Sequence, residues 1–135
     1  MADSISLDKL DLKKEVNAVL LAYGLQVDDA LQASIDTVSK EAVKRLKTVS
    51  LAHGWRKYAS SWKYDRKGGK QAKGAVIYNG KYGPLTHLLE NGHEIISHGK
   101  STGQRTRAFP HIAQVDAYVA QELPKEVEKA IQEIK

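Results

Sequence analysis

A chain of 135 residues is the length of a single domain and is long enough to bury one hydrophobic core. Its composition, 41% hydrophobic and 27% charged residues, is that of a soluble globular protein, and the absence of cysteine excludes disulfides, thiolate nucleophiles and thiolate metal ligands. The net charge of +5 is concentrated in residues 53–107, whose eleven basic and three acidic side chains suit either solvated surface or a surface for phosphate or an acidic partner.

The N-terminal region predicts two helices and no membrane segment. Its start lacks the basic end and apolar run of a signal peptide, and its longest apolar stretch, AVLLAYGL, is far shorter than the ~20 residues of a membrane helix. Apolar residues at helical spacing predict a first helix over 12–23, which Gly24 can end in a left-handed cap. A second helix is expected to begin at Asp28 or Asp29, with an apolar stripe from Leu31 to Val49.

The middle of the chain predicts strands and loops. Aromatic residues alternate with smaller or polar ones over residues 58–64, which predicts a strand, and GAVIYN at residues 74–79 predicts a second one. The glycines and lysines between them predict a hairpin loop. Its basic residues, candidates for contact with a partner or DNA, are Lys67, Lys70 and Lys73.

The following segments predict a short helix, a short strand and a second basic loop. Pro84 suits the start of a helix that ends before Gly92, and residues 94–97 predict a strand. The stretch HGKSTGQRTR predicts a mobile loop, with three more candidate contact residues: Lys100, Arg105 and Arg107. A last helix follows Pro110, and Pro124 within it predicts a kink or two short helices. The expected fold is a single α+β domain over residues 1–135, with a small, mostly antiparallel sheet packed against long N- and C-terminal helices.

The stretch HLLENGHEIISHGKSTG raises the question of catalysis. GKSTG matches the nucleophile-elbow pattern, but no helix is predicted directly after Ser101, as that chemistry requires. His87 and Glu90 share a helical face, and other histidines nearby could complete a zinc site, yet no zinc-protease spacing is present. We therefore expect no metal, no other cofactor and no enzymatic activity. Glu90 opposes the dipole of its own helix, which predicts a basic or histidine partner in this chain or a neighbouring copy.

Aromatic and basic residues alternate between Trp55 and Lys67, a pattern that also occurs in proteins that bind single-stranded nucleic acid. Large aromatics at alternating strand positions are more typical of a core. A basic nucleic-acid-binding module and, after it, a metal-dependent enzyme remain the alternative functions.

Four blocks carry a family resemblance: KYASSWK (57–63), VIYN (76–79), LTHLLENGH (85–93) and FPHIAQV (109–115). In this order and spacing, residues 28–131 resemble the neck proteins of long-tailed bacteriophages, the gene-product-ten-like family of phage HK-97. Such a protein is a structural component that joins or completes the tail at the head–tail interface. The resemblance implies fold or interface positions, without chemistry, for Trp62, Asn79, Leu88, Leu89, Glu90, Gly92, His93, Pro110 and His111.

The resemblance also implies partners and a location. The expected partners are further copies of the chain in a ring such as a hexamer, neighbouring neck or tail proteins, and DNA in the channel that the ring would surround. The expected location is the virion neck, after assembly in the bacterial host cytoplasm, without contact to a membrane.

Overall fold

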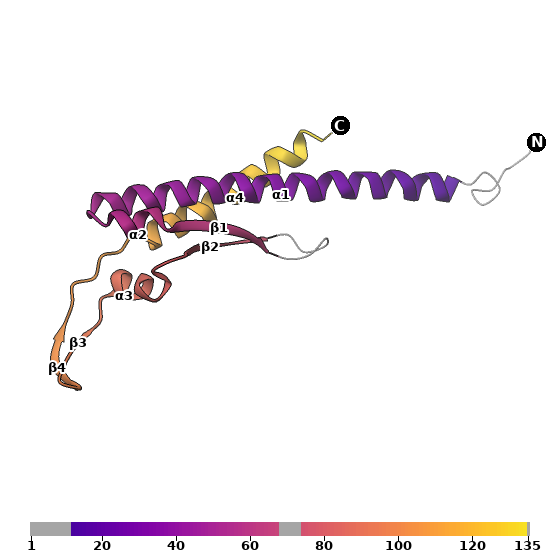
Figure 1. Ribbon diagram of the computed structural model, residues 1–135. Helices are drawn as coiled ribbons and strands as arrows, with labels where there is room; N and C mark the ends of the chain where they lie inside the picture. The colour runs from indigo at the N-terminus through magenta and orange to yellow at the C-terminus, as the bar shows by residue number, and fades with distance from the viewer. Residues whose placement is uncertain (1–11, 68–73, 135) are drawn as a thin grey trace, which may run out of the picture.

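The computed structural model describes residues 12–67 and 74–134, which form helices and two small antiparallel sheets (Figure 1). The α+β class is therefore confirmed, with a long helix at each end of the described chain. The elements are, in order, α1 (Leu12–Ala52), α2 (Arg56–Ser60), β1 (Trp62–Lys67), β2 (Gly74–Asn79), the 3-10 turn η1 (Gly83–Leu85), α3 (Thr86–Asn91), β3 (Glu94–Ser97), β4 (Lys100–Arg105) and α4 (Ala113–Gln132).

Helix α1 is one continuous element of 41 residues, so the prediction of two helices separated at Gly24 is wrong. Gly24 lies within the helix, and a Cβ built on it would meet nothing within 4 Å. A glycine inside a helix costs only about 1 kcal/mol relative to alanine, and no proline interrupts the segment. Because good helix formers stand on both sides, that cost does not end the helix.

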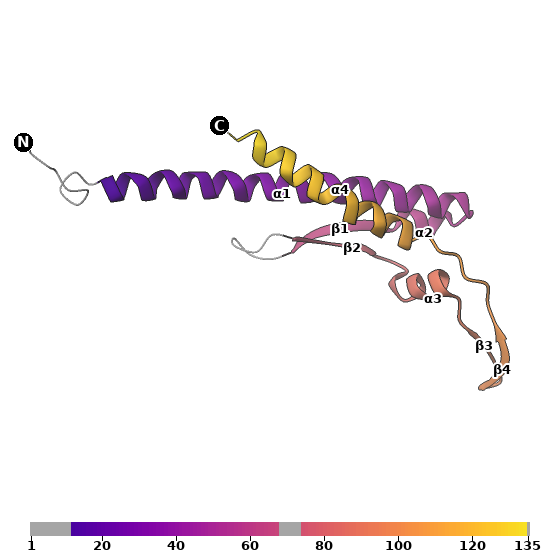
Figure 2. The same cartoon turned by 180° about the vertical axis from the view of Figure 1, so that it is seen from behind.

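Helix α4 runs back along the second half of α1, and the core lies where the two helices meet the β1–β2 hairpin (Figures 1 and 2). Near the far end of this contact, the Ser34 hydroxyl donates to the Ala30 carbonyl oxygen at 2.8 Å and also lies 3.3 Å from the Glu126 carbonyl oxygen of α4. Burying each Val or Leu side chain stabilises the fold by about 1.5–3 kcal/mol. The buried core cluster consists of Ala42, Leu46, Tyr58, Trp62 and Val115.

Pro124 lies inside α4, which is a single helix, so the alternative of two short helices is wrong. Proline removes the N–H that would bond to the carbonyl four residues earlier. Here that carbonyl belongs to Ala120, and both Ala120 and Pro124 are exposed. Water can therefore take the place of the lost donor, and the helix continues.

The two sheets are separate hairpins. Strands β1 and β2 pair from Trp62–Asn79 to Lys67–Gly74, while β3 and β4 form a second pair with an irregularity between Glu94 and Ile96. The strand predicted over 58–64 begins only at Trp62, because Tyr58 lies in the short helix α2, where its side chain and that of Ala59 are buried. The strands predicted over 74–79 and 94–97 are confirmed.

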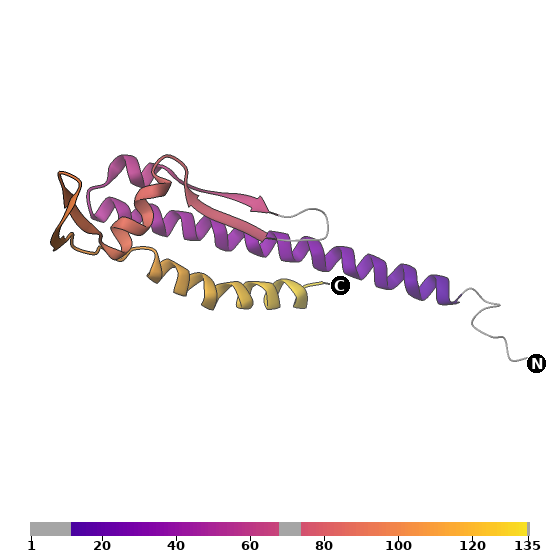
Figure 3. The same cartoon turned by 90° about the horizontal axis from the view of Figure 1, so that it is seen from below.

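The predicted loop over residues 98–107 is mostly strand β4, so that prediction is wrong. His98 and Gly99 have φ values of 51° and 76° and connect Ser97 to Lys100 in a two-residue turn. Such turns with two left-handed residues match the twist of a hairpin, and His98 is a residue type that tolerates this conformation. The β3–β4 hairpin projects from the body as an arm (Figures 1 and 3). Every residue of β4 is exposed.

Candidate functional site

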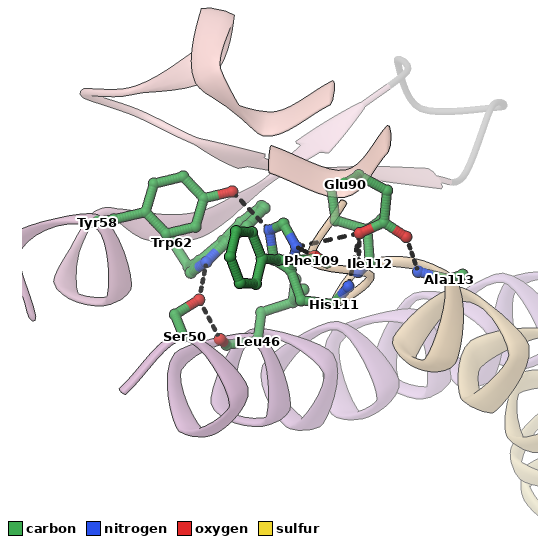
Figure 4. A network of polar contacts seen from close by, with 9 residues as sticks. All are labelled: Leu46, Ser50, Tyr58, Trp62, Glu90, Phe109, His111, Ile112 and Ala113. Carbon is green, nitrogen blue, oxygen red and sulfur yellow. Dashed lines mark hydrogen bonds and ion pairs between the residues drawn. The ribbon is translucent and has the colours of Figure 1, made fainter. Parts of the chain in front are cut away.

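Glu90 stabilises the start of α4 from the last turn of α3 (Figure 4). Its carboxylate accepts the backbone N–H groups of His111 at 2.6 Å, Ile112 at 2.7 Å and Ala113 at 3.0 Å. The residue at the N-cap position, Ile112, has no side chain that could do this. The first N–H groups of a helix lack partners within the helix and carry partial positive charge, so a carboxylate satisfies them by hydrogen bonding and by charge.

The pKa of Glu90 follows from this arrangement. Burial raises the pKa of the carboxyl, but the hydrogen bonds from His111, Ile112 and Ala113 together outweigh burial and hold it below its ordinary value. Glu90 is therefore ionised at neutral pH. The sequence showed Glu90 as a negative charge at the unfavourable, C-terminal end of its own helix. The structure explains this position, because the same charge interacts favourably with the N-terminal end of the α4 dipole.

His111 lies beside Glu90 and is fully buried. Its Nδ1 is 2.8 Å from the Phe109 carbonyl oxygen and 3.0 Å from Glu90 Oε1, and its Nε2 is 2.8 Å from the Tyr58 hydroxyl. Two acceptors at Nδ1 assign a proton to that nitrogen, and in this tautomer Nε2 accepts from the Tyr58 hydroxyl. The expected basic or histidine partner of Glu90 is thus present within the same chain.

Tyr58 supplies the proton at the other side of the histidine. Burial, and secondarily the negative charge of Glu90, raise the pKa of Tyr58 to about 12. The hydroxyl therefore keeps its proton at any physiological pH and acts as a donor. A tyrosine in this state is a poor general base, so the pair serves to hold α2 against the segment that leads into α4.

A second polar contact closes the cluster from α1. Trp62 Nε1 donates to the Ser50 hydroxyl at 3.0 Å, and that hydroxyl donates to the Leu46 carbonyl oxygen at 2.7 Å (Figure 4). Among the described residues, no buried side-chain nitrogen or oxygen lacks a hydrogen-bond partner. The two sets of hydrogen bonds are connected by packing, because the ring centres of Tyr58 and Trp62 are 5.4 Å apart. We call these residues the polar lock: Ser50, Tyr58, Trp62, Glu90 and His111.

The residues assigned by the resemblance fall into two groups. Asn79 is buried, donates to the Tyr58 carbonyl at 2.8 Å and accepts from the Tyr82 N–H at 2.8 Å, so it ties β2 to α2. Gly92 has a φ of 74°, and an added Cβ would lie 2.6 Å from the Thr106 carbonyl oxygen. Asn79 and Gly92 therefore hold the fold together, as do Trp62, Glu90 and His111. Leu89 belongs to the same group, because it packs against the core. Leu88 is half-buried, while His93 and Pro110 are exposed.

The residues considered for catalysis or metal binding do not come together. His87, His93 and His98 are exposed, and His93 Nδ1 lies 2.9 Å from the adjacent Glu94 carbonyl. Within residues 12–67 and 74–134, no three His, Asp or Glu side chains cluster as metal ligands would. Ser101 is an exposed residue of β4 that hydrogen-bonds to Glu94, far from the strand-to-helix turn of a nucleophile elbow.

The basic candidates occupy two different hairpins. Lys67 is the last residue of β1 and is exposed, so it belongs to the strand and not to the predicted loop, while Lys70 and Lys73 lie outside the described residues. Lys100 and Arg105 belong to β4, and Arg107 follows that strand. The β3–β4 arm and the far end of β1–β2 point away from each other (Figure 1), so the structure does not combine the two sets into one surface.

Two of the arm's cations also have structural contacts. Arg105 Nη2 donates to the Gly92 carbonyl oxygen at 3.3 Å, and the Arg107 guanidinium lies 5.5 Å from the centre of the Phe109 ring. Lys100, by contrast, is the first residue of β4 and stands directly after the turn of the hairpin. Of the four aromatic residues considered as a base-stacking platform, Tyr58 and Trp62 are buried, while Trp55 and Tyr64 are half-buried.

The sequence did not predict the role of Ser50, and it did not predict that the first half of α1 is exposed. Ser50 interrupts an apolar stripe at a position where a helix faces a core, which could have signalled a buried hydrogen bond. Val16, Val19, Leu20, Leu21, Tyr23 and Leu25 are between 48% and 68% exposed, and helical spacing predicted a helix there without showing that it lies outside the core.

None of the described helices is both long enough and apolar enough to cross a membrane. Comparisons with protein-family models, with curated proteins and with solved structures each found no match.

Proposed function

We propose that this chain is a structural protein of the neck of a long-tailed bacteriophage, which joins or completes the tail at the head–tail interface. The observation that carries the proposal is where the four resembling blocks lie in the fold. They supply Tyr58 and Trp62, Asn79, Glu90, and His111, which join α1, α2, β2, α3 and α4 around one buried cluster. Blocks that meet in this way support their interpretation as the signature of one fold.

The chemistry of the cluster supports a role in assembly over a role in catalysis. Its ionisable groups are engaged with one another or with backbone groups, and His111 is fully buried. The extended parts of the molecule, by contrast, are projecting elements: the first half of α1 and the β3–β4 arm (Figures 1 and 2). Projecting elements on a fixed scaffold suit a protein that contacts several neighbours. Further copies in a ring, neck or tail proteins and DNA in the channel are the proposed partners.

The test uses the phage or prophage that carries this gene. Deleting the gene should leave filled heads and free tails in the lysate, and expressing the wild-type chain from a plasmid should restore joined particles. Glu128→Gln, which changes an exposed carboxylate on α4, is the matched control and should restore joining as well. Joined, infectious particles from the deletion strain would contradict the proposal, as would a lysate without heads or without tails.

A further inference from the structure

The first half of α1 is a helix whose apolar side chains have no cover. It extends beyond α4 and both hairpins (Figures 1, 2 and 3), and every residue from 14 to 26 is exposed. An isolated helix of this length is marginal in water, because most helical stability in proteins comes from packing an apolar face. Contiguous exposed apolar patches of this kind mark interaction sites. The segment therefore requires a partner.

The segment is apolar around its whole circumference. Residues 18–25, AVLLAYGL, contain no charged side chain. At 100° per residue, Leu20 has the same direction as Val38 and Leu21 lies within about 20° of Leu46, so both continue the buried face of α1, while Val19 lies on the opposite side. A helix that is apolar all round is normally buried among other helices. Another helix is accordingly the kind of surface that fits here.

The charges at the two ends of the segment identify that helix. Lys14 and Asp28 stand seven residues before and after Leu21 and lie within about 20° of its direction, whereas Glu15, next to Lys14, points about 120° away from it; Asp29 follows Asp28. Neither aspartate forms an ion pair with another described residue. A second copy lying antiparallel would place Lys14 of each chain beside the aspartates of the other and bring the two Leu21 side chains together. A parallel copy would place Lys14 against Lys14.

We propose that residues 14–29 of α1 bind the same segment of a second copy of this chain in antiparallel orientation. This inference goes beyond the proposed function and does not depend on it, because it concerns the free chain. Because the exposed apolar side chains are spread around the helix, one partner helix covers only part of them, which is less than the ~800 Å² that each partner buries in a standard interface. The association is therefore reversible and depends on protein concentration in the micromolar range.

Sedimentation velocity of the purified chain from about 1 µM to about 200 µM tests the proposal. The wild type should pass from monomer to dimer. Leu21→Gln with Leu25→Gln should stay monomeric without a change in melting temperature, because these side chains lie in the exposed half of the helix, away from the core. A wild type that stays monomeric throughout, or a Leu variant that still dimerises, would overturn the proposal and leave the surface to a different protein.

A charge exchange tests the orientation. Lys14→Asp alone, and Asp28→Lys with Asp29→Lys, should each weaken dimerisation at least tenfold, because like charges then meet at both ends. Mixing these two variants should restore it, since the acidic chain complements the basic one. The absence of cysteine provides a clean background for a cross-link: Lys14→Cys should cross-link to Asp28→Cys and not to itself. A mixture that fails to associate, or a self-linked Lys14→Cys, would overturn the antiparallel arrangement.

Discussion

Glu90 lies in the last turn of α3, and its carboxylate caps the start of α4. Its contribution to stability follows from that position. Its hydrogen bonds from the His111 and Ile112 N–H groups are partly buried, where water cannot fully replace a carboxylate, while that from Ala113 is exposed. Losing a cap costs about 0.5–2 kcal/mol, and leaving buried donors unpaired adds about 1–3 kcal/mol. We expect Glu90→Ala to destabilise the fold by about 2–3 kcal/mol and Glu90→Gln by about 1 kcal/mol. Urea unfolding measures both, with Glu128→Gln as the neutral control.

The stabilisation by Glu90 should depend on pH. Its carboxyl has a lower pKa in the folded chain than in the unfolded one, so its contribution is complete above the unfolded value of about 4.3 and declines as pH falls through the folded value. The difference in melting temperature between the wild type and Glu90→Gln should be constant from pH 8 to about pH 5 and shrink below about pH 4. A constant difference down to pH 3 would show that the charge of Glu90 does not stabilise α4.

Gly92 allows α3 to end directly against the segment that follows the arm. A Cβ at this position would lie 2.6 Å from the Thr106 carbonyl, and its φ of 74° is unfavourable for other residues. Gly99 has nearly the same φ, 76°, but open space around its Cβ position. Gly92→Ala should cost about 2–3 kcal/mol and Gly99→Ala about 1 kcal/mol, because only the first adds a clash to the backbone strain. Equal losses in urea unfolding would contradict the close approach.

At the scale of elements, α1 has one half that packs against the core and one half that is exposed. We expect the exposed half to open more readily than the packed half. Gly24 lies in the exposed half, and its Cβ position is free. Gly24→Ala should raise helix content and slow amide exchange over residues 14–26, because alanine raises the free energy of local helix opening by about 0.5–1 kcal/mol. Amides of residues 38–50, within the core, should be unaffected, and they serve as the internal control. Slower exchange throughout α1 would mean that the two halves unfold together.

The basic residues of the β1–β2 hairpin should matter for assembly more than for folding. Lys67 is exposed at the end of β1, and exposed charges usually change stability by no more than ~0.5 kcal/mol. Lys67→Glu, Lys70→Glu and Lys73→Glu together should leave the melting temperature nearly unchanged but impair head–tail joining, because like charges govern encounter with an acidic partner. Normal joined particles would remove the functional role of these lysines, and a large loss of thermal stability would show that they belong to a structural segment.

The elements that sequence periodicity predicted best are those whose partners are near in sequence or whose apolar stripe is long. The stripe of α1 from Val38 to Leu46 and the strand at residues 74–79 follow from local spacing alone. Tyr58 is buried in a helical turn although it continues the alternation of the following strand, because its partner is His111, 53 residues away. The sequence indicated that Glu90 has a partner, because its charge opposes the dipole of its own helix. It could not indicate that the partners include N–H groups at the start of α4, because only the folded chain brings those groups to Glu90.

At the scale of the whole molecule, one buried lock holds a scaffold from which two elements project. The lock joins the end of α1 and the start of α4 to α2, β1 and α3 (Figure 4). The first half of α1 and the β3–β4 arm extend in different directions (Figure 1). A protein built to surround a channel needs contacts on more than one side, since head-to-tail contacts close a ring only when each copy meets two neighbours. The β3–β4 arm is the element available for such a contact in the proposed ring, because the α1 segment is proposed to pair with its own copy in antiparallel orientation.

The central proposal is that this chain is a structural part of a phage neck. A cryo-electron density map of particles from the phage that carries the gene tests it most directly. We expect several copies of the chain in a closed ring around the channel at the head–tail junction, with the polar lock inside each copy and the β3–β4 arm at the contacts. A map in which this fold is absent from the junction, or is present as one copy away from the axis, would contradict the account.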